Sequence, residues 1–147
     1  MTPREAYNAA HETFFKTQYP NAYKDGHYSP PNYPKVDKAN GLTQWIVNYL
    51  TWSGMYGNRI NTQGQFMTER YKGRIVSSGF RPSSTRRGTA DIHCIISGRH
   101  VSIEVKVGRD RVGPEQLKEA ERVRRSGGIY QVIHNPEEFL ALLETVS

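Results

Sequence analysis

The stretch DIHCIISGRHVSIEVK, residues 91–106, decides the fold, because its alternation of apolar and polar residues predicts a β-hairpin. One face of the two predicted strands is uniformly apolar and is expected to face the core. That face consists of Ile92, Cys94 and Ile96 on the first strand and Val101, Ile103, Val105 and Val107 on the second. The opposite face carries Asp91, Glu104 and Lys106, which a purely structural hairpin would not need.

Gly98 favours a two-residue turn, which we expect at Gly98 and Arg99. In that register Asp91 lies opposite Lys106, and Glu104 is the diagonal neighbour of Asp91 on the same face. Two hard oxygen donors at this spacing suit Mg²⁺ or Mn²⁺, which also keep bound waters. The other interpretation is a cross-strand ion pair between Asp91 and Lys106 on a solvated sheet face. The pattern alone leaves both interpretations open.

The helix predicted from Pro114 to about Ser126 adds another polar residue to this region. Gln116, Ala120 and Val123 fall on one side of it, so Gln116 is expected to point inward. It would either bond a backbone carbonyl or help to position a metal-bound water or a phosphate.

A basic segment precedes the hairpin and predicts a nucleic-acid-binding surface. Residues 70–90 contain six cations and no acid, with hydroxyl side chains between them, a composition typical of phosphate contacts. The predicted contact residues are Arg70, Lys72, Arg74, Arg81, Ser83, Arg86 and Arg87. The alternative is a solvated basic loop.

The remaining elements predict an α/β fold with a mixed sheet, since helices and strands alternate along the chain. We expect helices at 2–17, 42–53 and 136–146, short strands within 55–61, at 73–80 and at 129–133, and a loop at 81–88. Residues 19–41 are rich in tyrosine and proline and form either a linker or an arm that wraps a partner. The predicted domains are therefore an N-terminal extension, 1–41, and a main domain, 42–147.

The composition is that of an ordinary globular chain with a mild preference for a polyanionic partner. The 147 residues carry a formal net charge of +6 and a single cysteine, Cys94, which we interpret as a core residue. No apolar run approaches the roughly 18 residues of a membrane span. We expect a cytoplasmic protein of a bacterial or phage-infected cell that binds DNA, with no membrane contact and no nucleotide cofactor.

Four short motifs occur in a characteristic order. They are Gly-Thr-x-Asp at 88–91, Ile-Glu-Val-Lys at 103–106, a helical Pro-x-Gln at 114–116 and Gly-Gly-x-Tyr at 127–130. This set resembles the virus-type replication-repair nuclease (VRR-Nuc) family of the PD-(D/E)XK superfamily. The matching region is 42–133, about two thirds of the chain.

The resemblance implies a four-stranded sheet between helices and divalent-metal-dependent cleavage of DNA, with Mg²⁺ or Mn²⁺ as cofactor. It implies that Asp91 and Glu104 are metal ligands, that Lys106 is the catalytic lysine and that Gln116 is a further active-site residue. His93, on the same face as Glu104, would be either a supporting or a structural residue. Similar stand-alone proteins from viruses and bacteria are homodimers that act on branched DNA such as four-way (Holliday) junctions.

The chain departs from the family pattern at two positions. Ala90 stands where the family often has proline, and the first core helix lacks the family's glutamate, with Asn40 near that position. Asn40, Glu69 or waters would then complete the metal coordination. The missing acid leaves two other readings open: a nuclease-like module that binds DNA without cutting it, and an interaction protein whose acids pair with Lys106 and Arg87.

Overall fold

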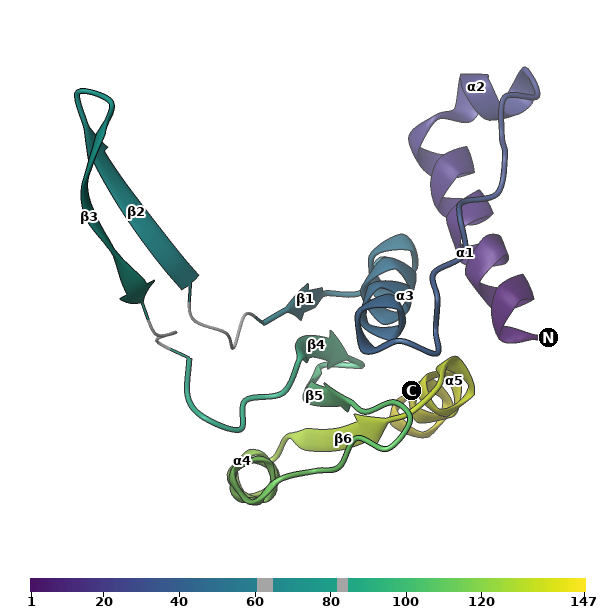
Figure 1. Ribbon diagram of the computed structural model, residues 1–147. Helices are drawn as coiled ribbons and strands as arrows, with labels where there is room; N and C mark the ends of the chain where they lie inside the picture. The colour runs from purple at the N-terminus through teal and green to yellow at the C-terminus, as the bar shows by residue number, and fades with distance from the viewer. Residues whose placement is uncertain (61–64, 82–84) are drawn as a thin grey trace.

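A four-stranded mixed sheet forms the centre of the computed structural model, which describes residues 1–60, 65–81 and 85–147 (Figure 1). Its strands are β1 (Gly57–Arg59), β4 (Ile92–Ile96), β5 (Arg99–Val105) and β6 (Ile129–Ile133), in the order β1-β4-β5-β6. The β1–β4 and β4–β5 pairs are antiparallel, and β6 runs parallel to β5. The predicted α/β class and mixed four-stranded sheet are confirmed.

Helices cover both faces of this sheet. They are α1 (Pro3–Gln18), α2 (Pro20–Lys24), α3 (Ala39–Trp52), α4 (Pro114–Arg125) and α5 (Pro136–Val146). The main core lies between the sheet, α3 and α5, whereas α4 covers the other face through a smaller cluster of Ala90, Ala120 and Tyr130. Within the described part of the chain, no helix combines the length and the apolar character that a bilayer crossing requires.

The apolar face of the predicted hairpin is the centre of the main core. Its residues from Ile92 to Val105 are at most 3% exposed, and they pack against Leu42, Trp45 and Phe139 of the flanking helices. Each fully buried aliphatic side chain of this kind contributes about 1.5–3 kcal/mol to folding. Because the apolar face of the hairpin is buried in this core, its polar face is turned toward α4.

The turn of this hairpin was predicted one residue too late in the sequence. The turn residues are Ser97 and Gly98, with φ of 51° and 79°, and Ile96 pairs with Arg99. Moving the turn by one residue shifts the register by two, which leaves every side chain on its predicted face. Hydrophobic alternation therefore cannot separate the two registers, and the left-handed conformation of both turn residues decides between them.

The N-terminal extension folds back on the main core. A capping box formed by Thr2 and Glu5 begins α1, which occupies the region where a helix was predicted. Tyr7 stacks on Trp45 at 5.4 Å between ring centroids, and Trp45 Nε1 donates to the Tyr33 hydroxyl at 3.1 Å. The arm thus contacts its own chain, and the short helix α2 within it was not predicted.

Strands β2 (Gln65–Tyr71) and β3 (Arg74–Arg81) form a separate two-stranded sheet that projects from the rest of the chain (Figure 1). The strand predicted at 73–80 is β3, but its partner β2 was missed, because its sequence QFMTERY alternates poorly. Arg81 ends β3 instead of starting the loop predicted at 81–88. Part of that predicted loop lies outside the described residues.

Candidate active site

Asp91 is held at the start of β4 by backbone contacts on both sides. Its Oδ2 accepts a hydrogen bond from the Val105 N–H at 2.9 Å, and its carbonyl accepts from the Ile60 N–H at 2.8 Å. Since Ile92 pairs with Ile103, the position opposite Asp91 is that of Glu104. The two acids are therefore directly opposed rather than diagonal, as the predicted register had them.

Glu104 is a buried carboxylate, 3% exposed, and its two oxygens differ in their surroundings. Oε1 accepts from Gln116 Nε2 at 2.6 Å and lies 3.3 Å from Lys106 Nζ. Oε2 is also buried but has no hydrogen-bond partner among the described residues. Such an atom carries an uncompensated desolvation cost unless a proton or a cation occupies the space beside it.

The electrostatics of Glu104 reflect this burial. Desolvation raises the pKa of Glu104 to about 7, and the negative charge of Asp91 adds to the rise. The Lys106 cation and the backbone amide of Asp91 act in the opposite direction. Without a further cation, the site is therefore close to taking up a proton at neutral pH.

Lys106 follows the end of β5 and is 8% exposed. Its Nζ lies between Glu104 Oε1, at 3.3 Å, and Asp110 Oδ2, at 3.9 Å. Its backbone N–H donates to the Ile133 carbonyl at 3.1 Å, which fixes it beside β6. Lys106 thus pairs with Glu104, and not with Asp91 as the predicted register implied.

Gln116 points inward from the first turn of α4, as its helical spacing predicted. Its Nε2 donates to Glu104, and its Oε1 accepts from the Gly113 N–H at 2.9 Å, which caps the helix. One side chain therefore joins the start of α4 to the buried carboxylate. The neighbouring Leu117 is 61% exposed.

Tyr130 also belongs to this site, although no role was predicted for it from the sequence. It is 3% exposed, and its hydroxyl lies near Glu104 while donating over a long 3.5 Å to the Gly88 carbonyl. Burial, followed by the charges of Glu104 and Asp91 and a contact with Glu104, raises the pKa of Tyr130. Its position in the Gly-Gly-x-Tyr motif was the available signal.

The two opposed carboxylates fit a divalent cation. Asp91 Oδ2 and Glu104 Oε1 accept hydrogen bonds from the protein, whereas Glu104 Oε2 has no hydrogen-bond partner among the described residues. Carboxylate oxygens with the remaining positions left to water are the ligands that Mg²⁺ prefers. Within 1–60, 65–81 and 85–147 there is no cluster of three or more acidic, histidine or cysteine side chains arranged for a metal.

Neither candidate for a third ligand forms a hydrogen bond or ion pair with Asp91 or Glu104 among the described residues. Asn40 is exposed in the first turn of α3. Glu69 is on the projecting β2–β3 hairpin, where its Oε1 pairs with Arg81 at 3.0 Å. The remaining coordination positions of a cation at Asp91 and Glu104 would be left to water.

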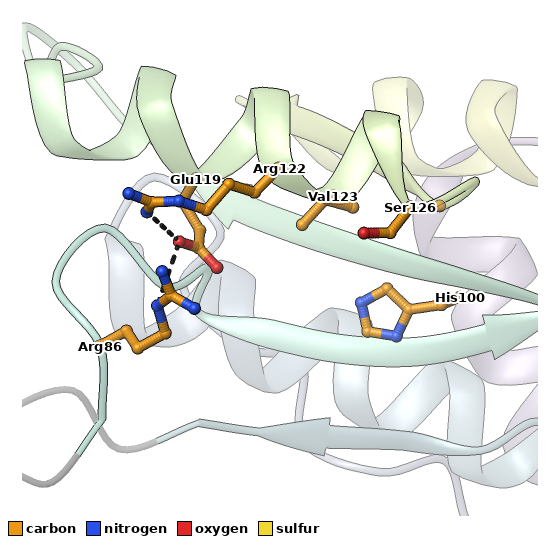
Figure 2. Close-up of a pocket in the computed structure, with 7 residues that line it drawn as sticks. Arg86, His100, Glu119, Arg122, Val123 and Ser126 are labelled. Atoms are coloured by element: carbon orange, nitrogen blue, oxygen red, sulfur yellow. Dashed lines mark hydrogen bonds and ion pairs between the residues drawn. The ribbon is translucent and has the colours of Figure 1, made fainter.

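A pocket of about 270 Å³, separate from the two acids, lies between α4 and β5 (Figure 2). It is lined by Arg86, His100, Glu119, Arg122, Val123, Ser126 and Gly128. Arg86 and Arg122 both contact Glu119, at 3.8 and 3.0 Å, so the acid partly neutralises the two guanidinium groups. The net positive charge of this pocket is therefore smaller than its two arginines alone would give it.

His93 lies beside this pocket and does not contact the two carboxylates. It is opposite Ser102 in the sheet, and its ring packs edge-on against His100, with 5.1 Å between centroids. Burial lowers the pKa of His93, the nearby His100 lowers it further, and Glu119 acts in the opposite direction. The neutral form is favoured at pH 7, which suits a structural residue.

The predicted basic track is divided into two groups in the structure. Arg70, Lys72, Arg74 and Arg81 belong to the projecting β2–β3 hairpin, whereas Arg86 and Arg87 follow on the segment that leads to Asp91. Ser83 lies outside the described residues. No family model and no curated protein matches this chain.

Proposed function

We propose that this chain is a divalent-metal-dependent DNA endonuclease that hydrolyses phosphodiester bonds and selects branched DNA. The observation that carries the proposal is the buried Glu104 carboxylate, with one oxygen lacking a partner among the described residues and Asp91 directly opposite. Keeping an acid at this position, where a neutral residue would pack at lower cost, favours a function that needs the negative charge.

The residues around the two acids have distinct roles in this proposal. Asp91 and Glu104 would hold Mg²⁺ or Mn²⁺, which supplies a Lewis acid for the phosphate and lowers the pKa of a bound water. Lys106, beside Glu104, adds positive charge where the phosphate accumulates negative charge during hydrolysis. Gln116 is a positioning residue, because it acts through its hydrogen bond to Glu104.

The basic residues support DNA as the substrate. The chain carries a net charge of +6, and its cations include an exposed group on the β2–β3 hairpin and Arg87 close to Asp91. Selectivity for branched DNA rests on the family resemblance. Symmetric cutting of a four-way junction would require two active sites, so the proposal includes a homodimer.

The test is a cleavage assay with end-labelled four-way junction, flap and linear duplex, in Mg²⁺, Mn²⁺ or EDTA. We expect metal-dependent products, with junction cut in preference to duplex, and no products from Glu104→Ala. A thermal shift on adding Mg²⁺ that is present in the wild type and absent in Glu104→Ala gives a second readout that does not depend on activity. Equal cutting by both proteins would contradict the assignment.

A DNA-binding module without nuclease activity is the second candidate. It is favoured by the absence of a third acidic ligand among the described residues. It predicts junction binding with a steep dependence on salt, together with no products in any metal. The same assay, read alongside a binding curve, therefore separates the two functions.

A further inference from the structure

The β2–β3 hairpin exposes several aromatic and aliphatic side chains, which indicates that a partner binds to it. Phe66 and Phe80 are directly paired across the two strands and are 70% and 66% exposed. Tyr71, Ile75 and Val76 are each at least 60% exposed on the same hairpin. Isolated two-stranded hairpins are marginally stable in water, and contiguous exposed apolar surface marks an interaction site.

The charges of the hairpin indicate what binds there. Its cations, Arg70, Lys72, Arg74 and Arg81, face a single acid, Glu69, which is already paired with Arg81. Arg70 and Arg74 have no hydrogen bond or ion pair within the part of the chain that the structure describes. A second copy of the hairpin would bring like charges together, whereas a polyanion would be attracted.

The alternation of these cations with aromatic rings and hydroxyls fits nucleic acid in particular. Arginines and hydroxyls such as those of Thr68, Ser77 and Ser78 contact phosphate oxygens, and they lie between the exposed rings in the sequence. Exposed aromatic rings stack on bases that are unpaired or have been opened. A protein partner would need no such excess of positive charge.

We infer that the β2–β3 hairpin is a DNA-binding arm whose Phe66–Phe80 pair stacks on bases exposed at a branch point, while Arg70 and Arg74 contact the flanking phosphates. The inference rests on the proposed function for its substrate, DNA. It adds a reason for branch selectivity, because only DNA with unpaired or easily opened bases offers a ring face to the two phenylalanines. Each base stacked on an aromatic side chain changes Kd by roughly 5- to 150-fold.

The experiment compares Phe66→Ala/Phe80→Ala with Tyr56→Ala, which removes an exposed ring outside the hairpin. Binding to a four-way junction and to a duplex of the same sequence is measured in EDTA, so that no cleavage interferes. A 2-aminopurine base at the branch point reports unstacking. We expect at least about tenfold weaker junction binding and loss of the fluorescence rise in the double variant, and neither change in Tyr56→Ala.

Two further variants separate base stacking from charge and from folding. Phe66→Tyr/Phe80→Tyr keeps both rings and should retain junction binding. Arg70→Gln/Arg74→Gln should weaken junction and duplex alike and reduce the salt dependence of log K by about two phosphate contacts. Because both phenylalanines are exposed, the thermal midpoint of each variant should match that of the wild type.

Unchanged junction affinity and fluorescence in Phe66→Ala/Phe80→Ala would overturn the inference. A change from dimer to monomer in light scattering, with DNA affinity preserved, would overturn it in favour of a surface between copies of this chain. Failure of the proposed nuclease is a separate result, since it would appear as intact binding in EDTA without products in Mg²⁺.

Discussion

Glu104 and Gln116 are joined by a 2.6 Å hydrogen bond that connects the end of β5 to the first turn of α4. The same Gln116 side chain caps α4 through the Gly113 N–H. The bond occupies one oxygen of the buried carboxylate, whereas the other has no hydrogen-bond partner among the described residues. Folding thus orients Glu104 before any cation binds, which reduces the reorganisation that binding requires.

The stabilising contribution of protonated Glu104 in the metal-free protein should be lost as the pH rises from 5 to 8. The pKa of Glu104 is about 7 in the folded state against an ordinary value of 4.5, so the folded state holds this proton more tightly than the unfolded state. The contribution of this proton to the free energy of unfolding is fully present below pH 4.5 and is lost as the pH rises through 7, by up to about 3 kcal/mol. Urea unfolding in EDTA at pH 5 and pH 8 measures the difference.

Glu104→Gln is the control for this pH dependence. It keeps the shape of the side chain but cannot ionise, so the difference between pH 5 and pH 8 should shrink by the Glu104 contribution. Mg²⁺ should restore the wild type at pH 8, because it binds the ionised carboxylate, and should leave the variant unchanged. An equal loss of stability in both proteins would show that another group is responsible.

Lys106→Ala should separate metal binding from catalysis. Removing the cation 3.3 Å from Glu104 Oε1 relieves its repulsion of Mg²⁺, so we expect Mg²⁺ affinity to be kept or increased. Cutting should fall by about 10²–10³-fold, because positive charge near the phosphate is lost. Calorimetric titration of Mg²⁺ and single-turnover cleavage measure the two effects. Loss of affinity together with activity would instead indicate a purely structural lysine.

Gln116→Glu tests whether the site can accept a third carboxylate. Without metal, the new acid would lie against Glu104 and destabilise the fold, since two close carboxylates repel each other. With Mn²⁺ it would supply a further oxygen ligand, so the metal-induced rise in Tm should exceed that of the wild type. Gln116→Ala, which removes the bond without adding charge, should show no such increase. A smaller rise in Gln116→Glu than in the wild type would contradict the two-carboxylate site.

The sequence was sufficient to predict which residues share the polar face, but not which of them touch. Faces follow from a period of two, and a change of register by two residues preserves them, so Asp91 and Glu104 were assigned to one face and yet misaligned. The lack of a hydrogen-bond partner for Glu104 Oε2 among the described residues could not be predicted, because the atoms around it come from residues distant in the sequence, such as Gln116 and Tyr130. The β2 strand was missed since it is exposed and lacks the alternation that burial imposes.

Gly88→Ala should be markedly more destabilising than Gly98→Ala, although both glycines have a φ near +80°. At Gly88 an added Cβ would lie 2.2 Å from the Glu115 carbonyl oxygen in the first turn of α4, whereas at Gly98 nothing lies within 4 Å. Gly98→Ala should therefore cost about 1 kcal/mol from backbone strain alone. Gly88→Ala should add about 1–3 kcal/mol of overpacking and move the loop before Asp91 away from Gln116. Urea unfolding of both variants gives the comparison, and equal losses would show that the loop does not pack on α4.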